Sequence, residues 1–319
     1  MRDLQFGFSL NPTADIAAHR DLVRAAEEEG LDLVGVQDHP YSPALVDSFT
    51  LIAMLLEGTE RLRFFPDVAN LPLRHPSMLA KTAASLDLLS AGRFELGIGG
   101  GGYWSAIARM GMTPELGRAE ALSQLGEAVQ ILRALWRSAP EPVAFEGRHY
   151  TIPGLRSGPA PAHPISIWIG AQGPRALELT GRLADGWAAP IPSYLPYEKW
   201  AESNALIDEA ARASGRNPQD VLRIAQLVGT ITDRLGDAAA RTGKAPVRAT
   251  AEQWAALLAR LATEQPFRTF VFWPEEATVD QIGRFAREVV PAVRDMLARP
   301  RRRPATDPAS VTPRPSGLR

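Results

Sequence analysis

Cysteine is absent from this chain of 319 residues. Without thiols it can form no disulfide bridge, zinc–thiolate centre or iron–sulfur cluster, and it has no cysteine nucleophile. Lysine is scarce as well, since it occurs only at Lys81, Lys199 and Lys244. None of these three follows a predicted strand, so we do not expect a barrel lysine that forms a Schiff base with its substrate. This argues against an aldolase-type or lyase-type barrel.

Long apolar runs and an excess of positive charge are also missing. No stretch approaches the roughly 18 apolar residues of a membrane-spanning helix. The first residues, MRDLQFGFSLNP, lack the apolar segment of a signal peptide, so we expect a cytoplasmic location. The formal net charge is −1 at pH 7, and this balance does not favour a nucleic-acid partner. The expected partner is a small-molecule substrate.

Several well-known catalytic motifs are not found. The chain contains no HExxH, no GxSxG and no Walker lysine. Of its five histidines, only His39 and His75 follow predicted strands. We therefore predict no metal site, and a magnesium ion held by carboxylates alone is the only metal alternative left.

Short apolar segments alternate with helical ones along most of the chain. Strands are predicted at 4–10, 31–37, 61–69, 93–98, 165–169, 186–189, 221–230 and 267–273. Helical patterns follow them, and the clearest places Leu122, Leu125, Val129, Leu132 and Trp136 on one face. Eight such units predict an α/β fold, a (β/α)8 TIM barrel over residues 1–298. A doubly wound sheet is less favoured, because its glycine fingerprint is missing from the first strand–helix turn.

Three segments depart from the alternation. Residues 141–152 read as a β-hairpin inserted into the barrel, and residues 153–164 as a loop rich in proline and glycine. The tail, residues 299–319, has no hydrophobic face, so we expect it to be disordered.

In a barrel of this type, functional side chains gather where the strands end. Asp38 and His39 follow the second predicted strand, and such a pair can supply a proton donor and the group that orients it. Residues 97–102 follow the fourth strand with five glycines, which let a flat ring or a phosphate approach the backbone. Gly173 and Pro174 begin a helix after the fifth strand, and a helix start of this kind can bind an anion.

These stretches resemble a known family. The segments FGFSLNP, VGVQDHP, LPLRHP with its following helix, and GAQGPRALELTGRLADGW are similar to the bacterial luciferase-like monooxygenase superfamily. Within it, the Asp38–His39 pair and Asn70 resemble the branch that uses the deazaflavin coenzyme F420. The resemblance covers about residues 4–297. It implies a luciferase-like (β/α)8 barrel with a short insertion, in a protein that is usually a homodimer.

The resemblance also implies roles for individual residues. His39 would stand at the reacting centre, with Asp38 near the coenzyme. A bulge after the third strand, often containing a non-proline cis peptide, presses on the ring in this family and maps to Asp67 and Val68, followed by Ala69 and Asn70. The remaining predicted coenzyme contacts are Gly100 and Gly101 beside the ring, and Gln172, Gly173, Arg175 and Ala176 at the phosphate.

One position departs from the family pattern. F420-dependent glucose-6-phosphate dehydrogenases carry a glutamic acid in the glycine-rich loop, where this chain has Gly102. We therefore do not expect this sugar phosphate as the substrate, and His39 is left as the candidate acid. The sequence predicts an F420-dependent oxidoreductase acting on an unidentified small organic molecule. The alternatives are an FMN-dependent monooxygenase, which shares the barrel and the phosphate site, and a barrel that binds a flavin without catalysis.

Overall fold

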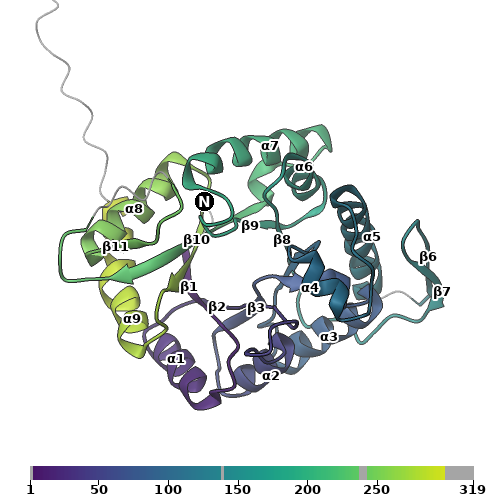
Figure 1. Ribbon diagram of the computed structural model, residues 1–319, viewed down its shortest axis with the longest axis horizontal. Coiled ribbons are helices and arrows are strands. Elements are labelled where there is room, and N and C mark those ends of the chain that lie inside the picture. The colour runs from purple at the N-terminus through teal and green to yellow at the C-terminus, as the bar shows by residue number, and fades with distance from the viewer. Residues whose placement is uncertain (1–2, 138–139, 237–242, 299–319) are drawn as a thin grey trace, which may run out of the picture.

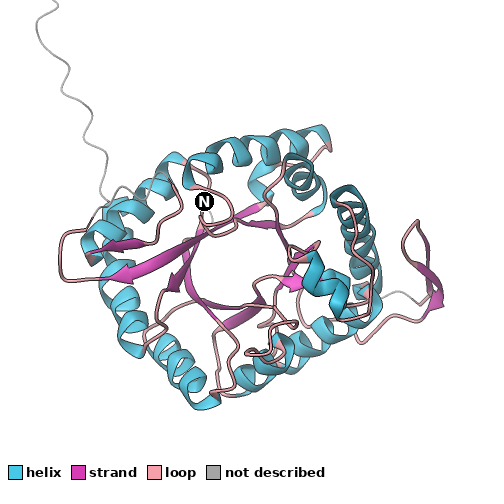
Figure 2. Ribbon diagram, viewed as in Figure 1, coloured by secondary structure: helices cyan, strands magenta, loops and turns pink. Residues whose placement is uncertain are grey.

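The structure, a computed structural model, describes residues 3–137, 140–236 and 243–298. Figure 1 shows a ring of strands in the centre of the molecule with helices around its outside. Figure 2 shows the same two layers by secondary structure. The ring consists of β1 (Gln5–Leu10), β2 (Leu33–Val36), β3 (Arg63–Pro66), β4 (Ala69–Asn70), β5 (Leu96–Gly99), β8 (Ile167–Gly170), β9 (Gly186–Ala188), β10 (Leu222–Ile231) and β12 (Thr269–Pro274).

The order of strands around the ring is β3-β2-β1-β12-β10-β9-β8-β5-β4, and all these pairings are parallel. A parallel bridge between Phe64 and Phe94 connects β3 to the residues just before β5. Because β5 pairs with β4, which is the other end of the path, this bridge brings the two ends of the path together. The (β/α)8 barrel predicted from the alternating pattern is therefore confirmed.

The helices cover the outside of the ring. They are α1 (Ile16–Glu28), α2 (Ser48–Glu57), α3 (Pro76–Leu89), α4 (Trp104–Arg109), α5 (Arg118–Trp136), α6 (Pro174–Leu183), α7 (Trp200–Ala213), α8 (Ala251–Glu264), α9 (Val279–Arg284) and α10 (Val290–Ala298). Capping residues in the local sequence fix where several helices begin. The side chains of Asp15 and Asp47 cap the N-termini of α1 and α2, and Thr250 and Gln253 form a capping box at the start of α8. α1 ends before Gly30, whose positive φ of 81° suits glycine.

The main core lies between the ring and the helices. Phe6 of β1 stacks on Phe270 of β12, and Phe272 stacks on Phe285 in the closing helix. All four rings are buried. Phe285 begins a π-helical segment, Phe285–Val289, that joins α9 to α10. Pro291 lies just after this segment, and a proline has no N–H to continue the regular pattern.

The structure corrects three secondary-structure predictions. The strand expected over residues 61–69 is two strands, β3 and β4, separated at Asp67 and Val68, because those two side chains are held from different sides of the barrel. The helix α4 was not expected, since six residues are too few to show a period. The additional strand β11 (Val247–Ala249) was missed for the same reason, and it pairs in parallel with β10.

The predicted insertion is present as a hairpin. Its strands are β6 (Val143–Glu146) and β7 (Thr151–Leu155), which pair antiparallel and lie outside the barrel in Figure 1. β7 extends three residues into the region expected to be loop. The tail at 299–319, which we expect to be disordered, lies outside the described residues. Among the described helices, none is long and apolar enough to cross a membrane.

Candidate active site

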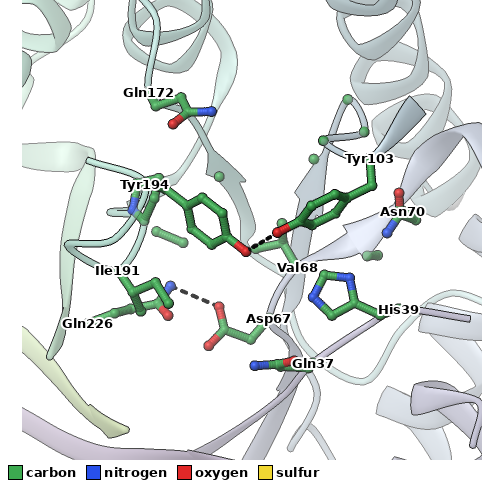
Figure 3. A pocket seen from close by; sticks show the side chains of 18 of the residues that line it. Gln37, His39, Asp67, Val68, Asn70, Tyr103, Gln172, Ile191, Tyr194 and Gln226 are labelled. Carbon is green, nitrogen blue, oxygen red and sulfur yellow. Dashed lines mark hydrogen bonds between the residues drawn. The ribbon is translucent and has the colours of Figure 1, made fainter. Parts of the chain in front are cut away.

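A cavity of about 340 Å³ opens at the ends of the barrel strands. Figure 3 shows it from close by. It is lined by Gln37, His39, Tyr41, Asp67, Val68, Ala69, Asn70, Gly99, Gly100, Gly101, Gly102, Tyr103, Gly170, Gln172, Ala188, Pro190, Ile191, Tyr194, Gln226 and Trp273. The cavity thus brings together eight of the twelve residues that the sequence nominates, namely His39, Asp67, Val68, Ala69, Asn70, Gly100, Gly101 and Gln172.

The peptide bond between Asp67 and Val68 is cis, as the family resemblance implies. Asp67 is buried, and its carboxylate accepts one hydrogen bond from the Ser9 hydroxyl at 3.0 Å and one from the Gln226 amide at 2.8 Å. Both donors are uncharged. Burial without a nearby cation raises the pKa of Asp67 to about 7, although the two hydrogen bonds act in the opposite direction. The cavity therefore contains a carboxyl group that titrates near neutral pH.

Val68 points the other way, toward strands β5 and β8. Glycines make room for it there: an added Cβ at Gly170 would lie 2.9 Å from one Val68 methyl carbon, and one at Gly99 would lie 3.0 Å from it. These distances are shorter than ordinary van der Waals contacts. The two glycines therefore allow the Val68 side chain to occupy the inner wall of the cavity, where the family resemblance expects a bulge beneath a ring.

His39 enters the cavity from the segment after β2 (Figure 3). Its Nδ1 lies 2.7 Å from the hydroxyl oxygen of Tyr41. Burial lowers the pKa of His39, and the nearby Asp38 counteracts this only in part. Burial also raises the pKa of Tyr41, so this hydroxyl keeps its proton. The imidazole is therefore neutral at pH 7, and the Tyr41 hydroxyl can pair with either tautomer, because it can donate to Nδ1 or accept from it.

Asp38 lies behind His39 and does not line the cavity. Its carboxylate accepts from Arg74 Nη2 at 2.8 Å, from the Ser48 hydroxyl at 2.7 Å and from the Asn70 backbone N–H at 2.8 Å. Arg74 also contacts the Asp47 carboxylate at 2.7 Å. The structure thus gives Asp38 a positioning role between two loops, and its predicted contact with the coenzyme stays a prediction. Arg74 thereby connects its loop to the segment after β2 and to the start of α2.

Asn70 connects this network to the cavity. Its side-chain amide donates to the backbone oxygen of Asp38 at 2.7 Å. Its Oδ1 atom is buried and has no hydrogen-bond partner among the described residues. A buried acceptor without a partner is costly, and a ligand N–H would satisfy it.

The helix start predicted to bind phosphate is present at α6. Gly173 is the residue before the helix, Pro174 is its first residue, and no side chain caps this end. An added Cβ at Gly173 would meet nothing within 4 Å, so the space in front of the helix is open. Gln172 lines the cavity, whereas Gly173, Arg175 and Ala176 lie beside it at the helix start. An anion bound here would be adjacent to the cavity.

A model of the luciferase-like monooxygenase family matches residues 4–308. The chain belongs to this family. A luciferase-like protein of Kineococcus radiotolerans named F420-dependent glucose-6-phosphate dehydrogenase is 31% identical over 259 residues, which cover 77% of this chain and 75% of that protein. A protein of the same name from Nakamurella multipartita is 34% identical over 176 residues, which cover 52% of this chain and 50% of that protein. The match therefore spans about half the length of the second relative.

Solved luciferase-like structures share the fold. An F420-dependent secondary alcohol dehydrogenase in complex with an F420-acetone adduct has a TM-score of 0.78 at 20% identity, covering 92% of this chain and 100% of that one. The coenzyme F420-dependent tetrahydromethanopterin reductase of Methanopyrus kandleri has a TM-score of 0.75 at 17% identity, covering 91% and 99%. At these identities the likeness is evidence for the barrel alone.

Sequence reasoning missed Gln226 in the luciferase-like site. This residue lies inside the buried strand β10, and a polar side chain in an otherwise apolar run was the available signal. Tyr41, Tyr103 and Tyr194 lie in the loop segments 41–46, 103–104 and 191–196, where the sequence predicts the pocket beyond the ring without giving its geometry. Trp104, in the second of these segments, does not line the cavity and lies beside Gly101, where an added Cβ would be 3.2 Å from its ring.

Proposed function

We propose that this chain is an F420-dependent oxidoreductase that transfers a hydride between F420 and a small organic substrate. The observation that carries the proposal is the neutral imidazole of His39, facing a cavity whose inner wall is Val68 and whose buried acceptor is Asn70 Oδ1. Two relatives named for F420 support the choice of this coenzyme over FMN.

The residues present fit a flat ring with an N–H group. Val68, Gly100 and Gly101 would flank the ring, and Asn70 Oδ1 would accept its N–H. The open start of α6, with Gln172, Gly173, Arg175 and Ala176, would hold the phosphate. When bound, F420 supplies a carbon atom that accepts or donates a hydride and does not usefully activate oxygen.

The protein itself has two tasks: it orients the substrate, and it transfers one proton to or from it. In the tautomer in which Nδ1 donates to Tyr41, Nε2 is free to take a proton from a substrate hydroxyl. That proton transfer gives an imidazolium, and in the direction of reduction the imidazolium returns the same proton to a substrate oxygen. The Tyr41 hydroxyl accepts from Nδ1 in both forms, so one residue serves oxidation and reduction.

Titration of the purified protein with F420 and, separately, with FMN tests the coenzyme. The fluorescence of each chromophore measures its binding. We expect micromolar or tighter binding of F420 and weak binding of FMN. Tight FMN binding with oxygen uptake would instead support the FMN-dependent monooxygenase. The non-catalytic barrel would be supported by two results together: the protein binds the coenzyme tightly, and the variant His39→Ala loses none of the protein's function.

We also propose that the protein is a homodimer in the cytoplasm. The family resemblance is the main support. A second support is a set of exposed apolar side chains on α2 and α3, which include Met54, Met78, Leu88 and Leu89. Light scattering on the purified protein checks the dimer, and a monomeric mass would contradict it.

A further inference from the structure

The described residues that line the cavity include no lysine and no arginine. The titratable side chains among them are His39, Tyr41, Asp67, Tyr103 and Tyr194. Asp67 is the carboxyl group of this set, and its two hydrogen-bond donors are uncharged. The cavity is therefore neutral when Asp67 is protonated and negative when it is ionised.

Two cationic side chains near the strand ends, Arg74 and Arg248, are paired with carboxylates, and Arg175 at the start of α6 lies beside the cavity without lining it. Arg74 contacts two carboxylates, at 2.8 Å to Asp38 and 2.7 Å to Asp47, and its guanidinium lies 4.3 Å from the centre of the Phe49 ring. Arg248 contacts the carboxylate of Glu275, which follows β12, at 2.7 Å. Neither arginine reaches the lining of the cavity. An anion inside the cavity would thus find neutral donors and no counter-charge.

The outer part of the cavity consists of aromatic rings, which we call the tyrosine cluster: Tyr41, Tyr103 and Tyr194. The ring centres of Tyr41 and Tyr103 are 6.1 Å apart, and those of Tyr103 and Tyr194 are 6.5 Å apart. The hydroxyls of Tyr103 and Tyr194 contact each other across the opening (Figure 3). Burial raises the pKa of Tyr41 and of Tyr194, so both hydroxyls stay protonated at neutral pH.

We infer that the substrate of this site is a small uncharged molecule with an apolar skeleton and a hydroxyl or carbonyl group, without phosphate or carboxylate. This inference rests on the proposed function for the reaction itself. An anion would lose its hydration without gaining a counter-charge, and it would face Asp67 and the electron-rich faces of the tyrosine rings. An uncharged molecule finds hydroxyl and imidazole partners in the tyrosine cluster and His39, and apolar surface at Ile191 and Trp273.

The inference separates this chain from relatives named for glucose 6-phosphate, whose substrate carries a phosphate. It depends on the absence of lysine and arginine from the described lining of the cavity, and not on the missing glutamic acid at Gly102. An F420-dependent enzyme with this cavity would act on a different chemical class of substrate from those relatives.

Calorimetric titration with matched probes tests the inference. The probes form three sets, and each set contains an uncharged alcohol, a carboxylate and an amine built on one skeleton. The first set is 2-propanol, lactate and 1-amino-2-propanol, and the second is cyclohexanol, 4-hydroxycyclohexanecarboxylate and 4-aminocyclohexanol. The third set is benzyl alcohol, 4-(hydroxymethyl)benzoate and 4-(hydroxymethyl)benzylamine. Glucose and glucose 6-phosphate form an additional pair. The titrations are made on the free protein and on the protein loaded with F420. We expect the uncharged member to bind best, with carboxylates and the phosphate weaker by about tenfold or more.

A charge placed in the cavity should reverse this order. Ile191 lines the cavity and points into it (Figure 3), so Ile191→Arg supplies the missing cation. We expect this variant to prefer the carboxylate member, whereas the matched control Ile191→Gln keeps the preference of the original protein. Circular dichroism of both variants checks that they fold.

Three results would overturn the inference: a charged probe that binds the original protein as tightly as its uncharged partner, no binding by any uncharged probe, or an unchanged order in folded Ile191→Arg. Failure of the coenzyme is a separate outcome. If F420 does not bind but the charge order holds in the free protein, the proposed function fails and the substrate class stands.

Discussion

The hydroxyl oxygen of Tyr41 lies 2.7 Å from Nδ1 of His39, and burial affects both groups in ways that keep them uncharged. The imidazole is harder to protonate than a histidine in water, and the phenol is harder to deprotonate than a tyrosine in water. The pair therefore consists of two neutral groups at pH 7 that exchange a hydrogen bond in either direction. The neutral imidazole, held by Tyr41, can take a proton from a substrate hydroxyl and return it once protonated, which is the proposed role of His39.

The first prediction concerns the titration of His39. Because burial disfavours the charged imidazole, its midpoint should lie below 6.5, so that it gains a proton only as the pH falls below that value. Tyr41→Phe keeps the burial and removes the hydroxyl, so the midpoint should stay low while the tautomer ratio changes. NMR of nitrogen-15-labelled histidine measures both, with His39→Gln to assign the signal. A midpoint above 6.5 would contradict the prediction.

Arg74 is predicted to matter for stability. Arg74→Leu leaves the carboxylate of Asp38 buried with hydrogen bonds but no counter-charge, and we expect a loss of about 3–5 kcal/mol in the free energy of unfolding. Asp47→Asn is the matched control, since it keeps the Arg74–Asp38 pair and removes a partner that is 40% exposed. Its cost should be at most about 1 kcal/mol. Equal losses in denaturant unfolding of the two variants would contradict this account.

Two glycines near the cavity should respond very differently to alanine. An added Cβ at Gly97 would lie 2.2 Å from the backbone oxygen of Pro66, whereas one at Gly102 would meet nothing within 4 Å. Gly97→Ala should therefore destabilise the protein by about 1–3 kcal/mol or more, and Gly102→Ala by close to zero. Thermal unfolding of both variants compares them. A large loss in Gly102→Ala would mean that the open space beside this loop is wrongly described.

Asp67 is predicted to make stability depend on pH. Its pKa in the folded protein is about 7, well above that of an exposed aspartate, so the fold favours the protonated form. Protonated Asp67 therefore contributes to the free energy of unfolding. This contribution is fully present below about pH 4 and is lost as the pH rises to about 7. The difference between the pKa values of the folded and the unfolded protein corresponds to about 4 kcal/mol.

Asp67→Asn removes this titration. The amide can accept from Gln226 and donate to the Ser9 hydroxyl, so both contacts survive. The variant should be more stable than the original protein at pH 8 and equally stable at pH 4, measured by the denaturant midpoint at each pH. If the original protein gained stability relative to the variant between pH 4 and pH 8, the sign of this prediction would be wrong.

The sequence by itself determined the barrel and the positions of many residues in the cavity. Local apolar patterns show that strand and helix periods alternate. Eight such units favour a closed barrel, and the residues after each of its parallel strands meet at one edge. This is why His39, Asn70, Gly100 and Gln172, which are distant in sequence, could be nominated together. The family resemblance added the cis peptide at Asp67 and Val68.

Only the tertiary structure decided which side chains face the cavity and what charge they carry. Asp38 and His39 are neighbours in sequence, yet one is turned toward Arg74 and the other toward the cavity. Burial in the folded chain raises the pKa of Asp67, and the two uncharged donors Ser9 of β1 and Gln226 of β10 offset this only in part. Electrostatic interactions act across space between elements far apart in the chain, so a local pattern contains no information about them. The absence of a cation from the described cavity lining, and with it the inferred substrate class, became visible only in the folded chain.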